Sequence, residues 1–157
     1  MKLIISMQFH CIEMDFVCVS SLIACCTILN CANWKSPQGY FKSVGQNSVK
    51  GLDDPINKGI DMVFKFSNPP PRYFICEVKY NNARLNKTIT KSGGSQMSIR
   101  WIERNLKRGA LKTHEYLKVM ESGYENMLIT VTTDGRIIKN ELECTDTSVK
   151  VASIWAG

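Results

Sequence analysis

The sequence predicts an α/β domain with a central mixed sheet of about four or five strands flanked by helices. Two strand-like segments, 59–67 and 73–80, are separated by Asn68 and three prolines, and proline interrupts a strand because it has no N–H to donate. Segments with helical spacing follow at 95–108 and 111–122, and a hairpin pattern, 127–132 and 136–142, surrounds Thr133-Asp134-Gly135. The order strand, strand, helix, helix, strand, strand indicates an α/β domain.

Length and composition are those of one soluble globular domain. The chain has 157 residues, 44% hydrophobic and 22% charged, which suffices to bury a core. We divide it into an apolar N-terminal extension, residues 1–40, and a domain, residues 41–157.

The extension is interpreted as a helix or strand-like segment that packs on the domain. Leu22-Ile23-Ala24-Cys25 resembles a lipoprotein cleavage box, but Glu13 and Asp15 precede it where a signal peptide has positive charge. Residues 16–30 are too few for a membrane span, so no stable membrane association is expected. The alternatives are an uncleaved signal, a membrane-tethered lipoprotein with lipid on Cys25, and a remnant of a longer precursor.

The cysteines do not suggest a zinc site or a disulfide framework. Five of the seven lie in residues 11–31, without a C-x-x-C pair. Cys11, Cys18 and Cys25 are seven residues apart, which indicates one apolar face of a helix. We expect reduced thiols and a cytoplasm-like compartment.

The remaining elements follow from turn and capping residues. Residues 33–57 predict a loop with a short helix at 38–44, and residues 81–94 a polar, basic loop. Ser95 is the predicted N-cap of the first long helix, which ends at Gly109 and turns Met97, Trp101, Ile102 and Leu106 toward the sheet. The second turns Leu111, Tyr116, Leu117 and Met120 inward, and the last residues add an edge strand or fray.

Two carboxylates and an amine are predicted to converge at one end of the sheet. Alternation puts Glu77 and Lys79 on one face of their strand, and Asp61 can join them from the neighbouring strand. Adjacent carboxylates repel unless a cation lies between them, and Mg²⁺ prefers such oxygen ligands. Lys79 could then orient or deprotonate a water, or offset charge on a phosphate. The alternative is a surface hairpin with ordinary charged residues on its wet face.

The same residues resemble a known nuclease superfamily. Gly59-Ile60-Asp61, then Glu77-Val78-Lys79-Tyr80, then Gln96-Met97-Ser98 with Trp101-Ile102, resemble the PD-(D/E)XK superfamily. More narrowly, they are similar to the restriction-endonuclease-like toxin domains of bacterial contact-dependent inhibition and Rhs-type proteins. The resemblance covers about residues 45–140. It implies a restriction-endonuclease-like core, Asp61 and Glu77 as metal ligands, and Lys79 as the catalytic lysine.

Two further features bear on that site. Many members carry another glutamate on a helix before the first strand, whereas here no Glu lies between Glu13 and Glu77. Either Asp53, Asp54 or Glu13 takes the place of that glutamate, or the catalytic site is weakened by its absence. Gln96, in the first turn of its helix, either holds a phosphate or the metal-bound water as a fourth catalytic residue, or is a surface glutamine.

The positive charge is concentrated after the candidate catalytic strand. Residues 79–112 hold nine Lys and Arg against Glu103 alone, a net +8, whereas the other eleven basic and thirteen acidic residues give −2. Such a stripe favours binding to a phosphate backbone, although a solvated helix face is the alternative. The residues expected to bind nucleic acid are Arg84, Lys87, Lys91, Arg100, Arg104 and Lys107.

These patterns together predict a metal-dependent endonuclease that hydrolyses phosphodiester bonds, with Mg²⁺ ahead of Mn²⁺ or Zn²⁺. The resemblance makes DNA the first choice of substrate, because the resembled folds mostly cut DNA, and transfer RNA the second, because related toxins include enzymes that cut it. The resemblance implies a toxin delivered into the cytoplasm of a target bacterium, or a cytoplasmic protein when made as a stand-alone chain, and a cognate immunity protein as partner. The competing hypothesis is a non-catalytic module that binds nucleic acid or an acidic partner.

Overall fold

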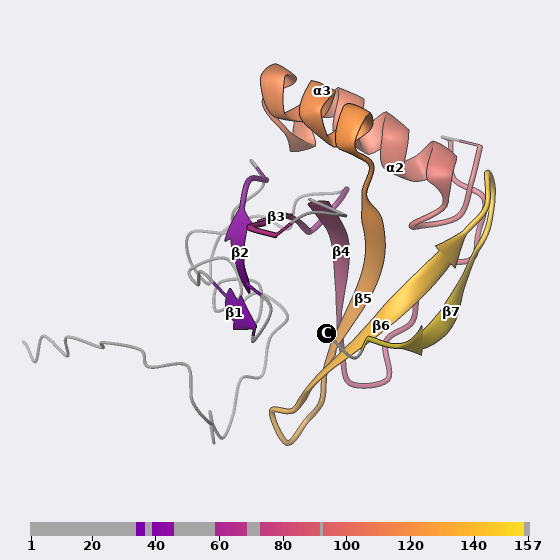
Figure 1. Ribbon diagram of the computed structural model, residues 1–157. Helices are drawn as coiled ribbons and strands as arrows, with labels where there is room; N and C mark the ends of the chain where they lie inside the picture. The colour runs from indigo at the N-terminus through magenta and orange to yellow at the C-terminus, as the bar shows by residue number, and fades with distance from the viewer. Residues whose placement is uncertain (1–33, 37–38, 46–58, 69–72, 92, 156–157) are drawn as a thin grey trace, which may run out of the picture.

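One twisted mixed sheet organises the chain. The computed structural model describes residues 34–36, 39–45, 59–68, 73–91 and 93–155. These form a sheet of seven strands whose spatial order follows the sequence (Figure 1). Neighbouring strands are antiparallel except β4 and β5, which are parallel. The strands are β1 (Trp34–Ser36), β2 (Gly39–Ser43), β3 (Met62–Phe66), β4 (Tyr73–Tyr80), β5 (Glu125–Val131), β6 (Ile137–Cys144) and β7 (Val149–Ile154).

Two helices make the crossover between the parallel strands. Parallel neighbours cannot be joined by a tight turn, so the chain must return along the sheet before it enters β5. It does so through α2 (Ile99–Asn105), the π-helical turn η1 (Leu106–Ala110) and α3 (Thr113–Ser122). Gly109 has a φ of 108° inside η1, a conformation that glycine adopts readily, and the change of direction between the helices falls there.

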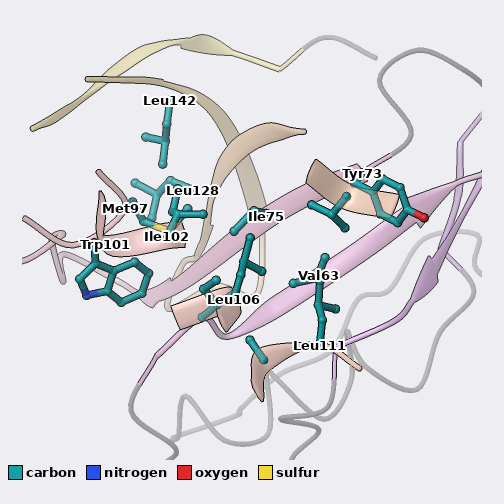
Figure 2. Packing of buried hydrophobic residues seen from close by; sticks show 13 residues of the cluster. Val63, Tyr73, Ile75, Met97, Trp101, Ile102, Leu106, Leu111, Leu128 and Leu142 are labelled. Carbon is teal, nitrogen blue, oxygen red and sulfur yellow. The ribbon is translucent and has the colours of Figure 1, made fainter. Parts of the chain in front are cut away.

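The helices cover one face of the sheet, and strand alternation supplies the core beneath them. Val63 of β3 and Ile75 of β4 lie near Leu106 and Leu111 of the helical segment (Figure 2). Tyr73 belongs to the same cluster, and its hydroxyl donates to Glu115 Oε2 of α3 at 3.1 Å. Burial of these apolar groups is the main stabilising contribution of the layer. The members from the helical segment are Met97, Trp101, Ile102, Leu106, Ala110, Leu111 and Val119.

The opposite face of the strands is also buried. The alternate residues Phe64, Phe74 and Cys76 belong to a second cluster. Trp155, directly after β7, packs edge-on to Phe74 with ring centroids 6.0 Å apart. The central strands β3, β4 and β5 are therefore apolar on both faces, which explains their nearly continuous hydrophobic sequence.

The first long helix begins later than predicted. Its N-cap is Ser98 rather than Ser95, and Met97, with a φ of 66°, lies in the preceding turn. The N–H groups of Ser95, Ile99 and Arg100 donate to the carbonyls of Thr147, Thr145 and Asp146. The β6–β7 turn thus supplies the acceptors, a long-range contact that capping rules do not contain.

Most other elements agree with the sequence, with three corrections. The hairpin over Thr133-Asp134-Gly135 and the final edge strand are confirmed. The helix predicted at 38–44 is wrong, since residues 39–43 form β2, so the sheet extends into residues assigned to the N-terminal extension. The sheet also has seven strands rather than about four or five. Finally, Leu117 is 60% and Met120 39% exposed, while Val119 is the fully buried residue of α3.

The mixed α/β class is therefore confirmed. The predictions for residues 1–33, including Glu13 and Cys25, lie outside the described residues, as do Asp53 and Asp54. Within the described ranges no helix is long and apolar enough to span a membrane.

Candidate active site

The pairing of β3 with β4 brings Asp61 and Glu77 together. Met62 pairs with Cys76 and Val63 with Ile75, so the next step of the antiparallel register sets Asp61 opposite Glu77. Ile75 faces the helices, and Glu77 and Lys79 share that face because strand residues alternate. Opposed residues on one face have Cβ atoms about 5 Å apart. The predicted convergence of two acids and one amine is found at this end of the strands.

Hydrogen bonds fix each of the three charged side chains. Asp61 Oδ2 accepts from the Val78 backbone N–H at 2.8 Å, which anchors the carboxylate beside β4. Lys79 Nζ donates to Glu77 Oε1 at 2.6 Å. The Glu77 side chain is 3% exposed and that of Lys79 15%. Glu77 is therefore buried, whereas Lys79 and Asp61 are partly open to solvent.

Burial raises the pKa of both carboxyls. The pKa of Glu77 is raised to about 8, first by burial and then by the charge of Asp61, while Lys79 lowers it. The pKa of Asp61 is also raised by burial, against lowering by the Val78 N–H and by Lys79. Two buried carboxylates beside each other are unfavourable when both are charged. At neutral pH the pair needs either a shared proton or a cation.

The donor set fits a hard divalent cation. Glu77 Oε2 is buried and has no hydrogen-bond partner among the described residues, whereas Oε1 is occupied by Lys79. Without metal, Glu77 and Asp61 can share a proton; once it leaves, two adjacent carboxylates with several waters form a donor set that suits Mg²⁺. In the part of the chain that is described, no group of three His, Cys, Asp or Glu side chains comes together. Asp61 and Glu77 are the two adjacent carboxylates that could hold a cation here.

Gln96 lies next to these residues, as its place in the sequence predicted. Its Nε2 donates to Glu77 Oε1, and its Oε1 accepts from the Asn86 N–H at 3.0 Å. Gln96 lies in the turn before α2 rather than in its first turn. The side chain therefore joins the carboxylate to the backbone of the following loop, a contact that the sequence analysis missed because its partner is a main-chain group.

The predicted nucleic-acid-binding residues fall into two groups. Arg84, Lys87 and Lys91 are exposed along residues 81–91, which we call the basic loop. Arg104 donates from Nη1 to the Lys91 carbonyl at 2.6 Å, so part of α2 lies beside that loop. Lys107 is exposed in η1, about two helical turns beyond Arg100.

Arg100 is partly neutralised by a residue that the sequence analysis did not select. Its Nη2 lies 3.1 Å from Asp146 Oδ2, with both side chains more than half exposed. Asp146 belongs to the same β6–β7 turn that accepts the N–H groups at the start of α2. The sequence around Asp146 could not predict its pairing with Arg100, because the two residues come together only in the folded sheet.

Comparisons with protein-family models, curated proteins and solved structures find no significant match to this chain.

Proposed function

We propose that the chain is a metal-dependent endonuclease with a restriction-endonuclease-like core. The observation that carries the proposal is the juxtaposition of Asp61, Glu77 and Lys79 on one face of β3 and β4. An antiparallel pair followed by a helical crossover into a parallel strand supports the same fold. The resemblance of the D…ExK and QMS-x-x-WI motifs adds to this support and supplies the catalytic assignment.

Asp61 and Glu77 would hold the cation through Oδ and Oε oxygens. A bound divalent ion supplies Lewis-acid chemistry at a phosphate and acidifies a water. The protein's part is to place two carboxylates beside each other and beside the lysine. A rigid strand pair is suited to this task, since β4 is hydrogen-bonded on both sides.

Lys79 would orient or help deprotonate the attacking water, or offset charge on the phosphate. An ammonium has three donors, and one of them is used on Glu77 Oε1. Its side chain is 15% exposed, so the remaining donors can reach a bound substrate. Gln96 lies beside Glu77 and would support the same arrangement.

Nucleic acid is the proposed substrate, with DNA ahead of transfer RNA. Exposed Arg84, Lys87 and Lys91 follow directly after the strand that carries Lys79. Cations there would bind the phosphate backbone and lead the scissile bond to the acids. Arg100, Arg104 and Lys107 would extend the contact along α2 and η1.

A toxin role agrees with the resemblance and gives the surface a second partner. A cognate immunity protein with an acidic face would cover the net +8 of residues 79–112. The proposed site of action is the cytoplasm of a target bacterium.

Cleavage assays test the proposal against the non-catalytic binding module. Supercoiled plasmid and transfer RNA are incubated with the protein and Mg²⁺, Mn²⁺ or Zn²⁺, or with a chelator. Metal-dependent cutting by the wild type and by Lys150→Ala, but not by Asp61→Ala or Glu77→Ala, supports the nuclease. Lys150 is a matched surface control because it pairs with Glu143 on exposed strands. Salt-sensitive binding without cutting would favour the binding module.

A further inference from the structure

Both ends of the Gln96 amide are engaged by protein atoms. A backbone N–H can only donate, so the group that faces the Asn86 N–H must be the Gln96 oxygen. That orientation turns Nε2 to Glu77 Oε1, a carboxylate oxygen that accepts. The hydrogen-bond chemistry thus allows one orientation of the amide.

Gln96 and Asn86 are also joined through their backbones. The Gln96 N–H donates to the Asn86 carbonyl at 3.0 Å, and the Asn86 side chain accepts from Thr88 N–H at 2.9 Å. Asn86 is therefore a fixed point in the basic loop, and exposed Lys87 is its neighbour. Arg104 attaches the loop at a further point, by its bond to the Lys91 carbonyl.

We propose that Gln96 is a positioning residue that couples the Glu77 carboxylate to the basic loop at Asn86. Two hydrogen bonds of the Gln96 side chain connect the Asn86 N–H to the Glu77 carboxylate. The position of the loop at Asn86 and the position of the carboxylate therefore depend on each other. The coupling is a property of the described contacts, but its use rests on the proposed function. If Glu77 holds a cation and Lys87 and Lys91 hold nucleic acid, then each ligand changes the affinity for the other by the same factor, because linkage is reciprocal.

Amide hydrogen exchange tests the coupling without metal or substrate. In Gln96→Ala the Asn86 amide should exchange about tenfold faster than in the wild type, the effect expected from the loss of one hydrogen bond. In Glu77→Ala it should also exchange faster, although residue 77 does not touch residue 86. Glu77→Gln, which keeps an oxygen for Gln96, should retain the wild-type rate, as should the surface control Glu143→Gln. An unchanged Asn86 rate in folded Gln96→Ala would overturn the proposal.

A Mg²⁺ titration followed by amide chemical shifts separates this proposal from the proposed function. In the wild type, Mg²⁺ alone should shift the amides of Val78 and of Asn86 and Lys87. In Gln96→Ala the Val78 shift should remain and the shifts at Asn86 and Lys87 should be lost. Wild-type shifts at Val78 without any at Asn86 would contradict the coupling. If no amide near the site responds, the metal proposal fails, and the exchange rates alone decide the coupling.

Discussion

Asp61 and Glu77 occupy opposed positions on two antiparallel strands, one step beyond the pair formed by Met62 and Cys76. Burial raises the pKa of both carboxyls, and the charge of Asp61 raises the pKa of Glu77 further. When both carboxyls are charged and no cation is bound, their opposed positions should therefore lower the free energy of unfolding.

Stability without metal should fall as pH rises from about 5 to about 8. The pKa of folded Glu77 is about 8, above its ordinary value of 4.5, so the folded state binds more protons in this window and loses stability as they leave. The pKa of Asp61 is raised and acts in the same direction. Glu77→Gln removes the charge and should raise the free energy of unfolding at pH 9 by on the order of 2 kcal/mol.

Urea unfolding in chelator at several pH values measures this dependence. Glu143→Gln, a change of the same type at an exposed position, should leave the curve within about 0.5 kcal/mol of the wild type. A wild type that becomes more stable across the same pH range would contradict the assignment of buried, opposed carboxyls.

Lys79→Ala should lower the cleavage rate by about hundredfold or more while Mg²⁺ still binds. The amine contributes to the reaction by orienting or activating water or by charge stabilisation, whereas the two carboxylates are the proposed ligands. Single-turnover cleavage together with calorimetric Mg²⁺ binding separates these effects. Lys150→Ala is the matched control, and equal cleavage rates in the two variants would remove Lys79 from the mechanism.

The basic loop should contribute to affinity through phosphate contacts. Lys87→Ala and Lys91→Ala should each weaken nucleic-acid binding and lower the slope of log K against log salt by about 1.

Asp146→Asn should strengthen binding, since it frees the Arg100 guanidinium 3.1 Å away. Fluorescence anisotropy at several salt concentrations gives both quantities.

Asp134→Asn provides the control for Asp146→Asn. Asp134 forms a similar exposed pair with Arg136, 2.6 Å apart, at the tip of the β5–β6 hairpin. The substitution Asp134→Asn removes one negative charge, as Asp146→Asn does, but at a position distant from α2. An equal gain in affinity from both variants would mean that net charge, rather than Arg100, is responsible.

Gly94→Ala should destabilise the protein by about 1–3 kcal/mol. An added Cβ would lie 2.1 Å from Ser98 Oγ and 3.3 Å from the Asp146 carbonyl, where the turn before α2 meets the β6–β7 turn. Ser98 Oγ is buried without a partner in the described part of the chain, so Ser98→Ala alone should cost little. Denaturant unfolding of the single and double variants should show that Ser98→Ala recovers part of the loss, and strict additivity would contradict the contact.

The strands and helices of the central part could be predicted from sequence because local patterns determine them. The alternation of the two faces in β4, the proline interruption after Asn68 and the Asp134-Gly135 turn are each determined by residues adjacent in the sequence. The same alternation predicted that Glu77 and Lys79 share a face, and the short connection from β3 predicted that Asp61 joins them.

The parts that were wrong or missed depend on contacts distant in sequence. Ser95 has the residue type of an N-cap, but carbonyls of the β6–β7 turn hold the start of α2, and the helix begins at Ile99. Residues 39–43 lie in the segment predicted as a short helix, and pairing with β3 makes them a strand. The bonds of Gln96 to Asn86 and of Arg100 to Asp146 likewise arise only when the sheet is complete.

Calorimetric titration of Mg²⁺ at pH 8 tests the central claim most directly. The wild type and Glu143→Gln should bind the ion with the same affinity, and both Asp61→Asn and Glu77→Gln should lose binding by at least about tenfold, because each removes one of two carboxylate ligands. Affinity in the wild type should fall as pH is lowered, since protons compete for Glu77. Undiminished Mg²⁺ binding in Asp61→Asn and Glu77→Gln would contradict the account.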